Sequence, residues 1–290
     1  IFLILFFFII TNTSKSDFKE IKKKAIITKP EIIFPIRENL DKCINNMYVN
    51  QTTNPVLPVI KVDAPSGYGL DNRFMYTLNK FENFKRPCGG GNIEACENVK
   101  RVILDWAKAD AAKRTGPSNH EGRHWNDTLT VNLWVASPMM AAYSFAKQII
   151  KVPDNEDKII KDWFERIVKK NKHLMYGMTY KQGTQAIGVP KRAHNHALSS
   201  AIAHMELGIL LNDNIQFRKA FKNYEAAIKH QRGDGSLPIE TRRGGRAMFY
   251  QGRAMNALSV IAIISENQGY NIWEYDYKGK NFHNIVKFFI

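Results

Sequence analysis

The clearest pattern along this chain is a recurrence of apolar residues every three or four positions. In Glu97–Lys113, the apolar residues Val99, Val102, Ile103 and Trp106 fall on one face of a helix. Similar patterns predict further helices over Leu129–Ile150, Asn155–Lys170, Asn195–Leu211, Asn214–His230 and Arg246–Glu266. Pro138 is expected to kink the first of these.

The predicted helices alternate in character. Asn195–Leu211 is apolar on nearly every side, which is typical of a buried helix, whereas Asn214–His230 is apolar on one face only. Helices joined by short loops pack as antiparallel pairs. We therefore predict an all-α fold, an (α/α) toroid in the form of an incomplete barrel of antiparallel helical hairpins. The lack of a sequence period disfavours a superhelical repeat.

The chain begins with an unbroken apolar run, Ile1–Ile10. The run is shorter than the roughly 20 residues that span a bilayer, and it has the length of the apolar part of an export signal. A buried strand is the alternative. We predict a signal or leader segment over residues 1–25, a single domain over 26–290 that is cut short at its C-terminus, and a periplasmic or secreted protein.

Proline and glycine predict loops between the leader and the first helix. Ser14–Lys29 is polar and basic, and it is expected to be loosely held. A short helix is expected near Glu38–Met47. Ala64–Arg73 contains glycine, aromatic and basic residues, so it is a candidate lid. Phe81–Asn92, with Pro87 and three glycines, is expected to be another loop.

The formal net charge is +15, from 42 basic and 27 acidic residues. A field of this sign attracts polyanions, which include nucleic acid, anionic lipid and acidic polysaccharide. The basic residues are spread along the chain, which disfavours a nucleic-acid-binding tail. The three cysteines Cys43, Cys88 and Cys96 match no zinc-binding spacing, and in an exported protein they predict one disulfide and one free thiol.

The first half of a candidate active site lies where the apolar helix begins. Asn195 is flanked there by His194 and His196. Free backbone N–H groups and the helix dipole make a helix start a good anion site. A lone asparagine at this place is usually only an N-cap, but two adjacent imidazoles favour a functional site.

The second half begins the last long helix. Arg246, Tyr250 and Arg253 are spaced i, i+4 and i+7, so they share one helix face, and Arg243 lies in the preceding turn. Nearby guanidinium groups should lower the pKa of a tyrosine, so that it can take and return a proton. The alternative is a solvated basic face with a tyrosine packed beside it.

β-Elimination from a uronic acid uses this combination of side chains. The C5 proton is removed next to a carboxylate, and hydrogen bonds from Asn, Arg and His to that carboxylate stabilise the enolate-like state. A base takes the proton, and an acid protonates the leaving O4. One tyrosine can do both when the two positions face the same side of the sugar.

Several motifs in order resemble the alginate lyases of polysaccharide lyase family 5. They are His194-Asn-His196, the turn Gly233–Glu240 with its Leu-Pro-Ile-Glu end, and Arg243-Gly-Gly-Arg-Ala-Met-Phe-Tyr250. Upstream, Trp106-Ala-Lys-Ala-Asp-Ala and Asn119-His-Glu-Gly-Arg123 are similar to two more family segments. The resemblance extends from about Cys96 to Gly269, and it implies a periplasmic mannuronate lyase with an (α/α) toroid fold that acts on an anionic polysaccharide.

The resemblance also implies roles for individual residues. Tyr250 would be the proton shuttle, while Asn195, His196 and Arg243 would neutralise the uronate carboxylate, and His196 would serve as base on the other epimer. Arg246 would support the site electrostatically. The sugar groove and lid would be lined by Asn119, His120, Arg123, Tyr68 and Arg73.

The resemblance pairs Cys43 with Cys96 in a disulfide and leaves Cys88 free. The chain departs from the family after the Asn-His pair, where Ala197 and Leu198 replace aromatic residues. Trp125 or Trp134 would then supply the surface on which a sugar ring stacks, although core packing is the alternative for Trp134.

Three other functions fit parts of the sequence. An inverting glycoside hydrolase of an (α/α) barrel type needs two facing carboxylates; Asp105, Asp110 and Glu240 are available, but the first two point to different helix faces. A metal hydrolase would use His194 and His196 but lacks an evident third ligand. A binding protein for polyanions has no need of the tyrosine. We therefore expect a monomeric lyase that needs no cofactor or metal and binds no nucleic acid, specific for polymannuronate or another polyuronate such as polyglucuronate.

Overall fold

The computed structural model describes residues 18–36, 72–112, 135–170 and 188–290. Within these ranges the regular structure is helical, apart from an isolated bridge between Tyr277 and Lys280. The elements are α1 (Phe18–Lys24), α3 (Asn72–Gly89), α4 (Ile93–Lys108), α6 (Ser137–Ile149), α7 (Asp154–Lys170), η3 (Lys191–Ala193), α9 (Asn195–Leu211), α10 (Asn214–His230), α11 (Pro238–Thr241), η4 (Gly244–Arg246), α12 (Ala247–Asn267) and α13 (Phe282–Phe289).

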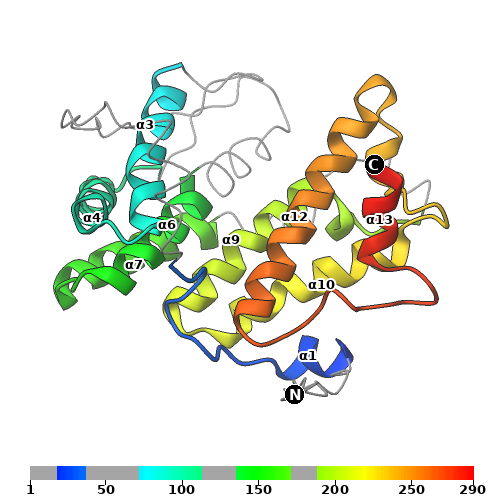
Figure 1. The fold of residues 1–290 in the computed structure, drawn as a ribbon, viewed down its shortest axis with the longest axis horizontal. Helices are drawn as coiled ribbons and strands as arrows, with labels where there is room; N and C mark the ends of the chain where they lie inside the picture. The colour runs from blue at the N-terminus through cyan, green and yellow to red at the C-terminus, as the bar shows by residue number, and fades with distance from the viewer. Residues whose placement is uncertain (1–17, 37–71, 113–134, 171–187) are drawn as a thin grey trace, which may run out of the picture.

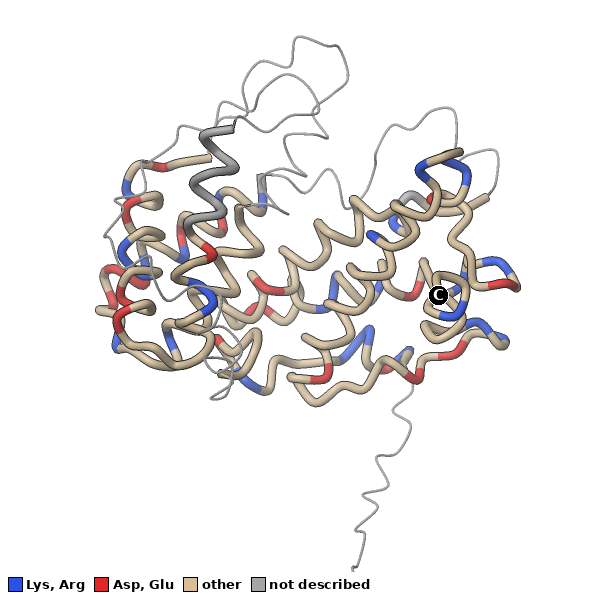
Figure 2. Tube along the Cα trace, turned by 45° about the horizontal axis from the view of Figure 1, so that its top comes forward, with Lys and Arg blue, Asp and Glu red and all other residues tan. Residues whose placement is uncertain are grey.

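The helices form an incomplete (α/α) toroid, as predicted (Figure 1). The pairs α3–α4 and α9–α10 are hairpins whose two helices pack on each other, and α6 and α7 both pack on α4 and α9. Basic and acidic residues are interspersed along these helices rather than gathered in one segment (Figure 2). None of the helices described is both long enough and apolar enough to cross a membrane.

The inner helix α9 organises the core. Every residue from Asn195 to Leu210 is buried, because α6, α7, α10 and α12 all pack against this helix. It ends at Leu211, and the following residue, Asn212, is the C-cap and adopts the left-handed conformation with φ 53°. The next residue, Asp213, caps α10 by accepting hydrogen bonds from the backbone N–H groups of Ile215 and Gln216. The predicted boundaries of α9 and α10 are confirmed.

Gly208 allows α9 and α10 to approach closely. A Cβ atom at this position would lie 2.5 Å from the backbone nitrogen of Phe217. We expect Gly208→Ala to lower the free energy of unfolding by about 1–3 kcal/mol, because the two backbones must move apart. Chemical denaturation measures the change. The control is Gly233→Ala at an exposed turn where a Cβ would meet nothing within 4 Å, and equal losses in both variants would contradict the packing explanation.

One predicted feature of the first helices is wrong. The loop expected over Phe81–Asn92 is mostly the end of α3, where Phe81 and Cys88 are buried and Pro87 is tolerated in the last turn. Pro138 lies in the first turn of α6, where proline lacks only an N–H that has no partner within that helix, and the kink expected there is not tested by the described part of the predicted segment. The residues of the predicted segment before 135, and those of the short helix predicted near Glu38–Met47, lie outside the described ranges.

The disulfide also differs from the expected pairing. Cys96 is bonded to Cys88, so Cys88 is not the free thiol, and the partner first assigned to Cys96, Cys43, lies outside the described residues. The glycine turn at 89–91 reverses the chain direction, so the end of α3 lies beside the first turn of α4. The Cα atoms of Cys88 and Cys96 are 4.7 Å apart.

The segment expected to be loosely held packs firmly from Phe18 onward. Phe18 is buried and stacks on Tyr275 with ring centroids 4.0 Å apart, and Lys22 pairs with Glu225 of α10. The following arm, residues 25–36, crosses the C-terminal ends of two helices. Glu31 N–H donates to the carbonyl of Ile209 in α9, and the buried side chain of Gln268 binds the arm just beyond α12.

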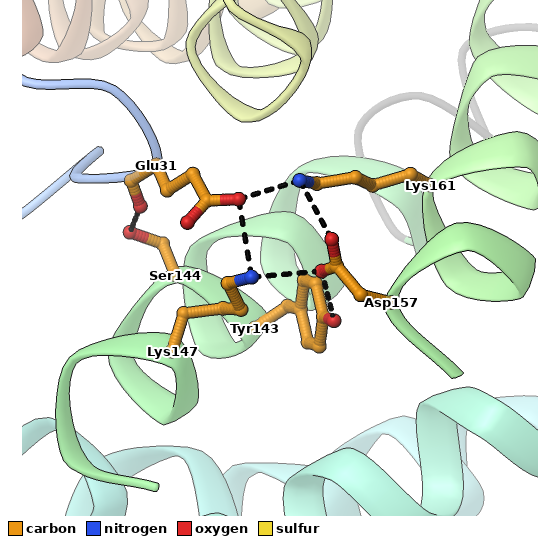
Figure 3. Close-up of polar contacts among 6 residues, drawn as sticks. All are labelled: Glu31, Tyr143, Ser144, Lys147, Asp157 and Lys161. Atoms are coloured by element: carbon orange, nitrogen blue, oxygen red, sulfur yellow. Dashed lines mark hydrogen bonds and ion pairs between the residues drawn. The ribbon is translucent and has the colours of Figure 1, made fainter. Parts of the chain in front are cut away.

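Ion pairs fix the arm to α6 and α7 (Figure 3). Glu31 pairs with Lys147 and Lys161, and both lysines also pair with Asp157. The Ser144 hydroxyl donates to the carbonyl of Glu31. These groups are half-buried and mutually paired, so we assign them a structural role at the end of the toroid where α9 and α12 finish.

Candidate active site

The opposite ends of α9 and α12, where both helices begin, carry the predicted catalytic residues. At the start of α9, His194 is the N-cap in an extended conformation, and Asn195 and His196 form the first turn. All three side chains are buried. The rings of His194 and His196 meet edge to face, with centroids 4.6 Å apart.

A buried carboxylate holds Asn195. Glu240 Oε1 accepts the backbone N–H of Asn195 at 2.8 Å, and Oε2 accepts the side-chain Nδ2–H at 2.6 Å. Glu240 has no exposed surface. One side chain thus binds a free N–H at the helix start and fixes the orientation of the amide beside it.

The turn between α10 and α12 places Glu240 in the interior. Gly235 adopts φ 90° against α13, where a Cβ would lie 2.0 Å from the carbonyl oxygen of Asn284. Leu237 N–H then donates to the buried side chain of Gln251 in α12. Pro238 begins the four-residue helix α11. The chain is therefore attached to the core immediately before Glu240.

Arg243 connects the two halves of the site. Its guanidinium carbon lies 3.8 Å from the centroid of the Tyr250 ring, which is a cation–π contact. Its Nη2 lies 2.5 Å from His194 Nε2, and its Nε lies 3.7 Å from Glu240 Oε2. A guanidinium can only donate, and the other ring nitrogen of His194, Nδ1, lies 3.2 Å from the backbone nitrogen of His196, whose N–H it caps.

Burial and nearby arginines keep both histidines neutral. Burial, followed by the charges of Arg243 and Arg253, lowers the pKa of His196 to about 3. Burial, His196 and Arg243 lower the pKa of His194 well below its ordinary value. Near neutral pH, the two imidazoles are therefore uncharged, and each can accept a hydrogen bond without adding positive charge to the site.

The structure brings together four of the predicted site residues: Asn195, His196, Arg243 and Tyr250. Arg246 is exposed at the end of η4. Arg253 lies over the ring of Phe249, and its charge acts on His196, so it also belongs to this end of the molecule. Arg73 lies in the first turn of α3. The remaining predicted binding residues lie outside the described ranges: Tyr68, Asn119, His120, Arg123 and Trp125.

Two contacts of the site were missed by the sequence reasoning. The sequence pointed to Glu240 as a possible hydrolase acid and the end of a family motif, and to His194 as a neighbour of Asn195 and a possible metal ligand, but not to the contacts that they make. Pro238 at a helix start predicts one turn of helix. Glu240 and Arg243 are three residues apart in sequence, so such a turn would bring their side chains close together. That signal could have linked the carboxylate to the arginine, although not to Asn195.

The geometry disfavours the hydrolase and metal alternatives. Glu240 is engaged by Asn195, Asp105 is exposed on α4, and Asp110 pairs with Arg166. His194 faces a guanidinium, which would repel a cation. Among the residues that the structure describes, no group of three or more His, Cys, Asp or Glu side chains is arranged to hold a metal ion.

Comparisons with known proteins agree with the sequence resemblance. A family model described as alginate lyase matches residues 29–290. An alginate lyase of Pseudomonas syringae pv. syringae is 25% identical over 186 residues, which cover 63% of this chain and 45% of that protein. The chain thus matches about half the length of this relative.

Solved structures with the same fold include alginate lyase A1-III from Sphingomonas species A1. It is 18% identical with a TM-score of 0.61, and the match covers 94% of this chain and 74% of that one. A histidine-to-alanine variant of A1-III in complex with a tetrasaccharide is 17% identical with a TM-score of 0.65. That match covers 93% of this chain and 78% of the other. A tyrosine-to-phenylalanine variant of A1-III has also been solved with a tetrasaccharide and is 18% identical with a TM-score of 0.60. That match covers 94% of this chain and 74% of the other.

Proposed function

We propose, from the premise that this chain belongs to the alginate lyase family, that it cleaves a polyuronate such as alginate by β-elimination. The observation that carries this proposal is the placement of Arg243. Its guanidinium stacks on Tyr250 and contacts His194, whose neighbours Asn195 and His196 begin α9. A phenol, an amide, an imidazole and a guanidinium thus meet where two long helices begin.

The reaction assigns each group a role. Asn195 and Arg243 bind the C6 carboxylate and stabilise the charge that develops as the C5 proton leaves. Tyr250 takes that proton, and the electron pair forms the C4–C5 double bond while the C4–O4 bond breaks. The tyrosine then returns a proton to O4. Neutral His196 lies beside these groups and is the candidate base for the other C5 epimer.

The neighbouring structures support the same pair of residues. The histidine and the tyrosine substituted in the two A1-III complexes are separated by the same number of residues as His196 and Tyr250. Those complexes contain a tetrasaccharide, which supports an oligosaccharide or polysaccharide as the ligand of this chain. The excess of basic residues in the whole chain favours an anionic one. An extracellular polymer as substrate fits a secreted or periplasmic protein.

Ultraviolet absorbance tests the proposal directly, because elimination creates a double bond conjugated with the carboxylate. We expect absorbance to rise when the protein is mixed with alginate, and polymannuronate, polyguluronate and polyglucuronate tested separately would rank the substrates. A chelator should leave the rate unchanged. New reducing ends without absorbance would instead indicate a hydrolase, and binding without either product would indicate a polyanion-binding protein.

A further inference from the structure

One side chain holds both groups that would bind the uronate carboxylate. Glu240 accepts two hydrogen bonds from Asn195, at 2.8 Å from its backbone nitrogen and 2.6 Å from Nδ2. The same carboxylate lies 3.7 Å from Nε of Arg243. Glu240 is fully buried and separated from Asn195 by 45 residues along the chain, so this contact depends on the tertiary placement of α11, which packs against α12.

The charge of Glu240 determines which end of the Asn195 amide faces it. An ionised carboxylate has no proton to donate, so the Nδ2 end must face Glu240 and the carbonyl end must point away. The amide has two N–H groups, and Glu240 uses one of them. The second is the donor that remains for a substrate carboxylate. A protonated Glu240 could donate to Oδ1, and it would therefore tolerate the reversed amide.

We propose that Glu240 is a positioning residue for the elimination, whose ionised carboxylate fixes the amide of Asn195 and the guanidinium of Arg243 in the orientation that binds the uronate. The consequence for turnover rests on the proposed function. The orientation of Asn195, by contrast, is a property of the free protein and can be measured without substrate.

The electrostatics predict when this orientation is lost. Burial raises the pKa of Glu240 to about 6, although the Asn195 hydrogen bonds and the charge of Arg243 oppose the shift. Around Asn195 and Arg243 also lie His194 and His196, whose lowered pKa values keep them neutral over this range, the phenol of Tyr250 and the guanidinium of Arg253. As pH falls through about 6, Glu240 therefore gains a proton while its neighbours keep their charges. We expect kcat/KM to fall over the same range.

Glu240→Gln tests the role with little change in volume. The two Asn195 donors bind different oxygens of Glu240, and glutamine replaces one of these oxygens by an NH₂ group that cannot accept, so one of the two contacts is lost. We expect kcat of this variant to fall about 10²-fold, as for a small misplacement of a catalytic group, with a smaller change in KM. The activity that remains should not fall near pH 6, because the variant has no carboxylate at this position to protonate. The matched control is Glu206→Gln in α9, because Glu206 is also buried and its pKa, raised to about 8 by burial, already keeps it neutral. This control should retain the wild-type rate and pH profile.

The side-chain amide signals of Asn195 give a second readout by NMR. In the wild-type protein without substrate, these signals should shift as pH passes through about 6, and they should not do so in Glu240→Gln. If the variant does not fold, the wild-type titration alone decides. Signals that stay constant through this range, or a folded variant with wild-type kcat and pH profile, would overturn the proposal. Titrating signals in a protein that makes no unsaturated product would reject the lyase function and leave the positioning role standing.

Discussion

Tyr250→Phe is expected to reduce turnover of a polyuronate by about 10³-fold or more while binding of the substrate is retained. The variant loses only the hydroxyl, which takes the C5 proton and returns a proton to O4, and one acid–base group typically contributes about 10²–10⁴-fold. The ring remains to stack against Arg243. Initial rates from the absorbance of the unsaturated product, with calorimetric titration of an oligouronate, separate the two effects.

A matched control is available in Tyr277→Phe. This tyrosine also has a cation near its ring, Lys229 at 4.9 Å from the centroid, but it lies in the segment between α12 and α13. The control should keep the wild-type rate. A Tyr250→Phe protein that turns over substrate as fast as this control would show that another group moves the proton.

Arg243→Ala is expected to raise the activation free energy by about 2–4 kcal/mol, as for loss of a transition-state hydrogen-bond donor. The substitution removes the contacts with Tyr250, His194 and Glu240 together. Arg243→Lys should recover only part of the rate, because an ammonium keeps the charge but cannot reproduce the planar stack and its directed donors. Steady-state kinetics over a range of oligouronate concentrations measures both variants.

The control for charge alone is Arg101→Ala, which removes a guanidinium that contacts Asn98 on α4. If lowering the net charge were responsible, both alanine variants would lose rate to a similar extent and added salt would mimic the loss. If Arg243 acts at the site, only its own variant should be impaired. An unimpaired Arg243→Ala protein would remove this residue from the mechanism.

The helices that the sequence predicts best are those whose signals are local. Asn195–Leu211 and Asn214–His230 have the predicted boundaries, because the Asn212-Asp213 pair supplies both a left-handed C-cap and an N-cap. The end of α3 was misjudged because Pro87 and the following glycines resemble a loop, whereas packing of Phe81 and Cys88 keeps the segment helical. The packed N-terminal arm was missed because its partners, such as Gln268, lie at the far end of the chain.

In the candidate active site too, local sequence patterns predicted some features, whereas contacts between distant segments could not be predicted. Helix periodicity placed Tyr250 one turn after Arg246, and the capping position of the Asn-His pair identified the start of α9. Neither pattern could show that Glu240 binds Asn195, because this contact is made between a four-residue helix and a helix start far away in sequence. Likewise, the disulfide follows the short turn between α3 and α4 rather than the pairing implied by the family resemblance.

Mass spectrometry of the products formed in water enriched in heavy oxygen tests the central claim most directly. Elimination divides the polymer without adding water, so the two product masses should sum to that of the substrate, and the cleaved ends should contain no heavy oxygen. The unsaturated fragment should be lighter than its saturated counterpart by the mass of one water. Incorporation of one heavy oxygen at each cleaved bond would instead establish hydrolysis and contradict a mechanism in which Tyr250 moves a proton from C5 to O4.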